Sequence, residues 1–299
     1  MPRSASEVLP LTVRAAQGWP YNGAVPTPFH HLVMAESVRQ SRKLAPAVRE
    51  ALDRSRPAFL LGHVAPDYVS LAGRPRTESH WFEVPMVDRR PAHLPLFQRH
   101  PELSDPERLD PDHAVFMAGY LVHLWVDQAW IAYIFEPAFG PIVARGTFEE
   151  RLLDHNLLRA ALDREDLARL PSGLDSVLQR AEPEGWLPFA SDADLRQWRD
   201  SLAEQLRPGA RPSTVEVFAS RHGLAPEAFA ARLSALEAGS RAAPGVVRPG
   251  RLEAFRRLAD DAARTLTQAY LLGHLVGPGL WNAPFPRPQR EPRPEKVVS

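Results

Sequence analysis

A nearly continuous apolar stretch, residues 118–135 (AGYLVHLWVDQAWIAYIF), contains His123 and, four positions later, Asp127. On a helix, residues four positions apart lie one above the other, so the imidazole and the carboxylate would project together. A carboxylate buried among apolar side chains is costly unless it pairs with a cation, takes up a proton or coordinates a metal ion. The spacing therefore predicts either part of a metal site or a hydrogen-bonded His–Asp pair in the core.

Three other segments contain side chains that could complete a metal site. His30 and His31 are adjacent in TPFHHLVMAE, and successive helical residues point about 100° apart, so only one of them can readily face a given site. Asp67 follows the apolar run FLLGHVAP, and His80 lies in the segment ESHWF. Each of these residues alone is more often structural, as a core histidine or a turn aspartate. The metal hypothesis depends on their combination.

The overall composition restricts the chemistry. The 299 residues include 36 Lys and Arg against 36 Asp and Glu, so no net charge favours binding to nucleic acid or to an anionic membrane surface. The absence of cysteine excludes a disulfide framework, a thiol nucleophile and thiolate-bound zinc, and a metal must use nitrogen and oxygen ligands. The N-terminal sequence has no basic head followed by an apolar core, so we expect no secretory signal and a cytoplasmic protein.

The elements that position these residues are predicted to be helices, because alternation of apolar and polar residues is scarce. We expect a helix after the N-cap Thr27, a break at Pro57, a loop-like region over 70–110 and a central helix over about 113–136. The spacing of Thr147 and Glu150 predicts a capping box. Further helices are predicted near 172–182, 191–206, 213–221, 225–238 and 251–276.

The central helix is long enough to be considered as a membrane span. An ionisable side chain at the bilayer centre costs roughly 3 kcal/mol or more, so we expect a buried core helix and no integral membrane span. The predicted organisation is an irregular segment (1–26), a metal-binding helical core (27–170), a helical C-terminal region packed on the core (171–281) and a disordered tail (282–299).

Four segments in order, HLVMAE, FLLGHVAPDYV, HWF and GYLVHLWVDQAW, resemble the zinc-dependent phospholipase C family, which is related in fold to the P1-type nucleases. The resemblance covers roughly residues 27–160. It implies an all-α, multi-helix phospholipase C/P1 nuclease-like core with a helical C-terminal extension. It also implies a small phosphoester or phospholipid-like substrate and a metal-activated water that attacks phosphorus.

The resemblance assigns ligands position by position. His31 would bind one zinc ion, and a neighbouring zinc ion would be held by the three residues Asp67, His80 and His123. Asp127 would link or complete the pair, and the two carboxylates are the expected catalytic residues. All of these ligands are nitrogen or oxygen donors, as zinc takes at open catalytic sites.

The sequence departs from the family pattern around a third zinc ion. About 30 residues precede His31, whereas family members with three zinc ions bind metal through a free terminal amino group. Tyr133 stands where those members have a histidine, and His155 is followed at the fourth position by Arg159 instead of glutamate. A guanidinium cannot bind a cation. We therefore expect one or two zinc ions, with His155 either a contributing ligand or a histidine packed against the apolar face.

The leading hypothesis is a zinc-dependent phosphoesterase that acts through Asp67 and Asp127. A second hypothesis is a non-catalytic helical protein that retains the fold, with a structural metal or none. A third is a binder of apolar ligands or membranes, suggested by the apolar stretch 114–135, in which tryptophans either line a pocket or belong to the core.

Overall fold

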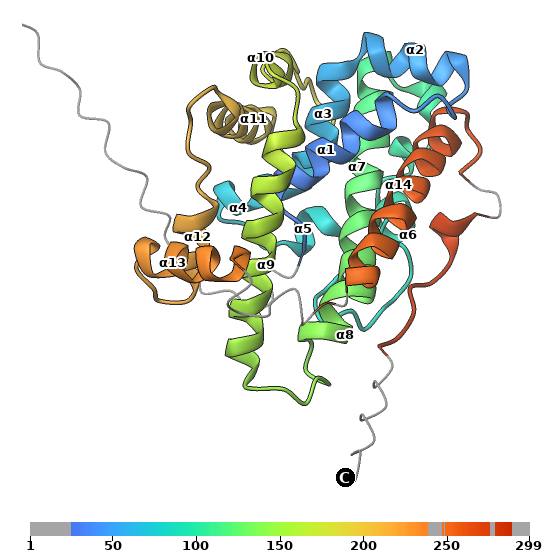
Figure 1. The fold of residues 1–299 in the computed structure, drawn as a ribbon. Coiled ribbons are helices and arrows are strands. Elements are labelled where there is room, and N and C mark those ends of the chain that lie inside the picture. The colour runs from blue at the N-terminus through green and yellow to red at the C-terminus, as the bar shows by residue number, and fades with distance from the viewer. Residues whose placement is uncertain (1–24, 239–246, 248, 276–278, 289–299) are drawn as a thin grey trace, which may run out of the picture.

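The computed structural model describes residues 25–238, 247, 249–275 and 279–288, and across them the chain is helical without a β-strand (Figure 1). The fold is therefore all-α, as predicted. The α-helices are α1 (Pro28–Arg39), α2 (Pro46–Arg54), α3 (Arg56–Val64), α4 (Val69–Ala72), α5 (Thr77–His80), α6 (His93–Arg99), α7 (Pro111–Trp130), α8 (Glu136–Phe139), α9 (Phe148–Arg169), α10 (Leu174–Leu178), α11 (Asp192–Leu206), α12 (Thr214–Arg221), α13 (Pro226–Glu237) and α14 (Pro249–Leu271). Short 3-10 turns are η1 (Ala65–Tyr68), η2 (Pro101–Leu103), η3 (Pro106–Arg108) and η5 (Leu280–Asn282), and η4 (Ile131–Phe135) is a π-helical turn.

Helix α7 is the centre of the fold, and every residue from Ala114 to Trp130 is buried. It packs mainly against α3 and α14, which lie beside it in Figure 1. The sequence predicted one helix over about 113–136, but α7 ends at Trp130 and the chain continues through the turn η4 into α8, with Pro137 inside that short helix. None of the described helices is both long and apolar enough to cross a membrane.

Other boundaries follow local sequence signals. Thr147 and Glu150 form the predicted capping box, with each side chain accepting a hydrogen bond from the other residue's backbone N–H. Thr27 is the N-cap position of α1, but its hydroxyl donates to Asp163 of α9 and does not cap the helix. The region 70–110, predicted to be loop-like, contains α5, α6 and two 3-10 turns.

Helices α10, α11 and α14 pack on the same core as the N-terminal helices, whereas α12 and α13 form a second apolar cluster with α9. Trp198 of α11 donates its indole N–H to the carbonyl oxygen of Val64, at 2.7 Å. Tyr270 of α14 donates its hydroxyl to the carbonyl oxygen of Leu103, at 2.8 Å. In the segment predicted as a disordered tail, Phe285 is buried and its backbone N–H donates to Arg89. The remaining residues of that tail, 289–299, and most of the predicted irregular segment 1–26 lie outside the described residues.

Helices α3 and α7 touch backbone to backbone at two glycines. A Cβ atom on Gly62 would lie 2.0 Å from the carbonyl oxygen of Phe116, and one on Gly119 would lie 2.7 Å from that of Phe59. Side chains at either position would force the helices apart. The contact also brings the carbonyl oxygen of His63 within 2.8 Å of His123 Nδ1.

We expect Gly62→Ala to destabilise the fold by roughly 3 kcal/mol, because a methyl group cannot fit against a backbone carbonyl in a packed core. The measurement is the free energy of unfolding from urea titrations. The matched control is Gly250→Ala on α14, where an added Cβ meets nothing within 4 Å. There the better helix propensity of alanine should leave stability unchanged or slightly raised. Equal effects of the two substitutions would contradict the close-contact explanation.

Candidate metal centre

Five of the six predicted metal ligands converge in the core. They come from four elements: His31 from α1, Asp67 from η1, His80 from the end of α5, and His123 and Asp127 from α7. Four of the five side chains have no exposed surface, and Asp67 retains 15% exposure. Their donor atoms form two groups that could each hold an ion, His31–His123–Asp127 and Asp67–His80–His123.

Four donor atoms, two imidazole nitrogens and two carboxylate oxygens, lie close together at His80 and His123. His80 Nε2 lies 3.3 Å from His123 Nε2, 3.4 Å from an Asp67 oxygen and 3.5 Å from Asp127 Oδ2. His123 Nε2 lies 3.3 Å from Asp127 Oδ2 and 4.0 Å from the Asp67 oxygen. Ligands about 2.1 Å from a tetrahedral zinc ion are about 3.4 Å apart. The separations of His80 and His123 from each other and from the two carboxylates are therefore compatible with a cation bound among them.

Asp127 also faces the second group. Its other oxygen, Oδ1, lies 3.2 Å from His31 Nε2, and the imidazole of His31 stacks on that of His123 with ring centroids 3.9 Å apart. A carboxylate that directs one oxygen to each group can bridge two ions. His30 instead points away from the cluster, and its Nδ1 lies 3.0 Å from Asp166 of α9. His31 is therefore the histidine of the pair that faces the site, as expected.

Hydrogen bonds behind the rings direct the ligand nitrogens toward the cluster. His123 Nδ1 donates to the carbonyl oxygen of His63 at 2.8 Å, and His80 Nδ1 lies 3.2 Å from the carbonyl oxygen of Arg76. A ring that donates through Nδ1 directs Nε2 toward the cluster, and the neutral form of such a ring binds metal through Nε2. Ser79, whose hydroxyl donates to Pro66 at 2.7 Å, holds the backbone beside His80.

Burial and charge set the protonation of the cluster. Burial, together with the charge on His123, lowers the pKa of His31 to about 4. Burial and the neighbouring Arg76 likewise lower the pKa of His80 to about 4, so both rings are neutral at pH 7. Burial opposes ionisation of Asp67, but His123 and His80 outweigh it and lower its pKa to about 2. The same balance lowers the pKa of Asp127.

Without an ion, the neighbouring carboxylates favour the protonated form of His123. Burial disfavours its charged form, but the charge and hydrogen bond of Asp127 and the charge of Asp67 prevail and raise its pKa. Arg76, on the loop before α5, supplies a second positive charge, and its Nη2 donates to Asp127 Oδ2. Nothing in the sequence indicated Arg76, because it lies outside any helical pattern that could place it near α7.

The sixth predicted ligand, His155, does not reach the cluster. Its Nε2 accepts a hydrogen bond from the indole N–H of Trp130 at 3.0 Å, and its ring packs 5.0 Å from both Phe135 and Phe139. Burial and the charge of Arg159 lower its pKa well below the usual value. His155 is thus a core histidine, and the structure corrects its assignment as a ligand.

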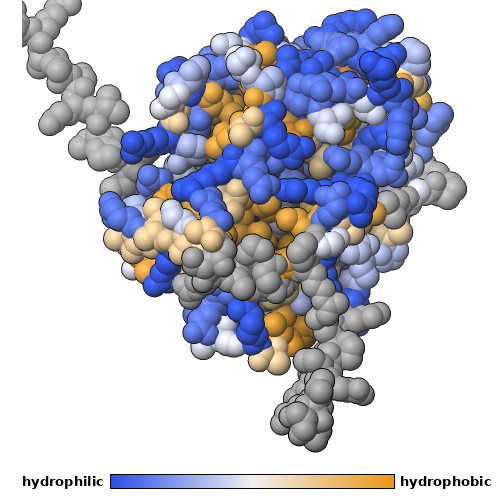
Figure 2. Space-filling model, viewed as in Figure 1, coloured by the Kyte–Doolittle hydropathy of each residue, from blue (hydrophilic) through white to orange (hydrophobic). Residues whose placement is uncertain are grey.

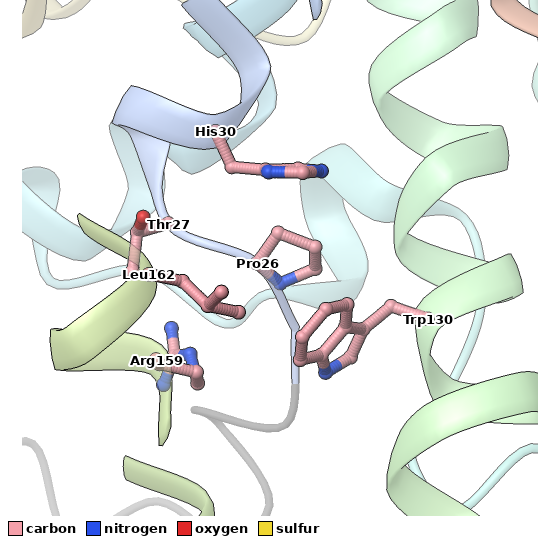
Figure 3. Close-up of a pocket in the computed structure, with 6 residues that line it drawn as sticks. All are labelled: Pro26, Thr27, His30, Trp130, Arg159 and Leu162. Atoms are coloured by element: carbon pink, nitrogen blue, oxygen red, sulfur yellow. The ribbon is translucent and has the colours of Figure 1, made fainter. Parts of the chain in front are cut away.

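A small pocket beside the cluster is lined by Pro26, Thr27, His30, Trp130, Arg159 and Leu162 (Figure 3). It encloses about 200 Å³, part of it open to solvent, between the start of α1, α7 and α9. Beneath it, Thr27 and Thr214 donate their hydroxyls to the buried Asp163, which ties α1 and α12 to α9. None of the five clustered ligands lines this pocket.

No family model, curated protein or solved structure matches this chain. The assignment of the site therefore depends on the residues and geometry of the chain itself.

We expect His123→Gln to lose most of the bound metal, because removing a ligand nitrogen weakens binding severely. The control is His155→Gln, an equally buried histidine whose replacement can still accept the Trp130 N–H. Metal content is measured by plasma mass spectrometry after zinc loading and desalting. Equal metal loss in both variants, or metal-free wild-type protein, would contradict the proposed ligand set.

Asp163 predicts a pH dependence of stability. Burial raises its pKa to about 6 against a reference value of 3.8, although the two threonine hydroxyls partly offset this. Between about pH 4 and 6 the folded state then holds a proton that the unfolded state releases, so stability falls as pH rises through this window. The loss approaches roughly 3 kcal/mol.

Asp163→Asn should remove this component of the pH dependence and be the more stable protein at pH 7, because asparagine needs no proton to be neutral. Urea unfolding of both proteins at pH 4.5 and pH 7 measures this component. The contributions of other carboxylates cancel in the stability difference between the two proteins. A stability difference between the two proteins that does not change with pH would rule out the buried Asp163 as its source.

Proposed function

We propose that the chain is a zinc-dependent phosphoric ester hydrolase with a phospholipase C-like core. The observation that carries the proposal is the buried cluster of Asp67, His80, His123 and Asp127, in which each of the two histidine Nε2 atoms lies 3.3–4.0 Å from the other and from an oxygen of both carboxylates. These are ligand types that suit zinc, and a second position at His31 fits a site with one or two ions. The four sequence segments that resemble the zinc-dependent phospholipase C family contain the same residues.

When bound, zinc would supply Lewis acidity toward a phosphoryl oxygen and a water molecule acidified for attack on phosphorus. The protein residues have separate tasks. His31 and His80, neutral at pH 7, offer lone pairs without first losing a proton. Asp127, with its two oxygens facing different histidines, holds the two groups in register.

Asp67 marks the side from which a substrate would approach. It is the one member of the five with exposed side-chain surface, at 15%, whereas the others are fully enclosed. A small phosphoester, or the narrow phosphoryl portion of a phospholipid-like molecule, suits such restricted access better than a bulky group at phosphorus. The exposure of Asp67 and the two-sided contacts of Asp127 with His31 and His80 support their proposed catalytic roles.

A second candidate function is a non-catalytic helical protein in which the cluster is structural. The specific observation in its favour is the pairing of Arg76 with Asp127, which together with a protonated His123 balances two carboxylates without any metal. Buried charges that are paired and hydrogen-bonded can be retained for their structural role alone.

Zinc-loaded protein should hydrolyse bis(p-nitrophenyl) phosphate, lose this activity in EDTA and recover it with added zinc. Asp67→Asn should lower kcat/KM by roughly 100-fold or more, because a neutral amide is a poor ligand for the ion. Asp53→Asn, which alters an exposed carboxylate on α2, is the matched control and should retain full activity. Stoichiometric zinc without turnover on phosphodiesters and phosphomonoesters would favour the second candidate.

A further inference from the structure

Arg76 lies at the cluster as a mostly buried arginine with an incompletely hydrogen-bonded guanidinium. Its side chain is only 10% exposed, and Nη2 donates to Asp127 Oδ2. Its other terminal nitrogen, Nη1, is buried and has no hydrogen-bond partner among the residues that the structure describes. Because both nitrogens are attached to the same carbon, Nη1 also lies beside the cluster.

The surrounding structure holds this guanidinium in place. The backbone carbonyl oxygen of Arg76 accepts hydrogen bonds from the backbone N–H groups of Ser79 and His80, at 3.1 and 3.0 Å. The guanidinium carbon lies 5.1 Å from the centre of the Phe82 ring, within the range of a cation–π contact. A buried polar hydrogen without an acceptor is unfavourable, and more so on a charged group, so an acceptor that reached Nη1 would be bound favourably.

The charge of the site indicates which acceptor is suitable. Two carboxylates and one divalent ion cancel, and the ring nitrogens that bind the ion are neutral ligands. With one ion bound, Arg76 therefore leaves the site with one net positive charge. A singly charged anion meets that excess, whereas a neutral ester gains nothing from it. Guanidinium groups are well suited to phosphate oxygens because of their planar arrangement of donors.

We propose that Arg76 binds the substrate, with Nη1–H donating to a non-bridging oxygen of a phosphodiester monoanion, and that it selects such anions over neutral esters. This inference rests on the proposed hydrolase function. Arg76 remains bonded to Asp127 throughout, so the same side chain aligns the bridging carboxylate and the phosphoryl group.

The test compares two substrates with the same leaving group, bis(p-nitrophenyl) phosphate, which is a monoanion, and diethyl p-nitrophenyl phosphate, which is neutral. Arg76→Ala should lower kcat/KM for the diester by about 10- to 100-fold and change that for the triester by less than about threefold. Arg76→Lys should recover part of the diester activity, because it restores the charge without the planar donors. The control is Arg74→Ala on the same loop, where Arg74 is 43% exposed and pairs with Glu78 at 3.8 Å.

Two further measurements separate the outcomes. Zinc content and thermal unfolding of each variant are recorded, and variants are compared only at equal occupancy. Dimethyl phosphate binding to zinc-loaded protein, by calorimetry, tests Arg76 without turnover and should weaken at least tenfold in Arg76→Ala. If wild type turns over neither substrate but binds dimethyl phosphate through Arg76, the hydrolase proposal fails and the anion site stands. Equal losses on both substrates, or unchanged dimethyl phosphate binding, would overturn the role of Arg76.

Discussion

The carboxylate of Asp127, enclosed in the middle of the most apolar helix, is the constraint on which the rest of the site depends. Without a partner, the desolvation of a buried carboxylate would cost more free energy than the net folding stability of a typical domain. His31 meets one of its oxygens, and His80, His123 and Arg76 surround the other. These partners come from three segments besides α7. Compensating one side chain therefore requires α1, α5 and α7 to meet at a defined point.

The close contact between α3 and α7 fixes the position of His123 in the cluster. Because Gly62 and Gly119 carry no side chains, the two backbones approach closely enough for the last carbonyls of α3 to be used by other elements. His123 takes the carbonyl of residue 63, and Trp198 of α11 takes that of Val64. Carbonyl groups at a helix C-terminus lack intrahelical partners, so these bonds satisfy α3 and orient the imidazole of His123 at the same time.

The parts of the site that were predictable are those that local sequence encodes. Helical spacing alone places His123 and Asp127 on one side of α7. The position of Asp67 directly after an apolar helix predicted that its carboxylate would face inward. His155 was misassigned because the sequence could not show that Trp130 would supply a hydrogen bond to its ring. Arg76 was missed because its role arises only from tertiary packing between the α4–α5 loop and α7. The all-α class followed from periodicity, whereas the π-helical turn before Pro137 did not.

The two candidate functions use the same residues and differ in what occupies the space between them. Without an ion, the proton of His123 and the guanidinium of Arg76 together offset Asp67 and Asp127. An ion bound at His123 Nε2 must displace that proton, since a metal ligand is the unprotonated ring. A guanidinium has no such exchange available, because it does not lose its proton in proteins. Proton and ion therefore compete at His123, while the guanidinium of Arg76 keeps its charge with or without the ion. The ion-loaded centre is then more positive than the ion-free centre, and it is the state suited to an anion.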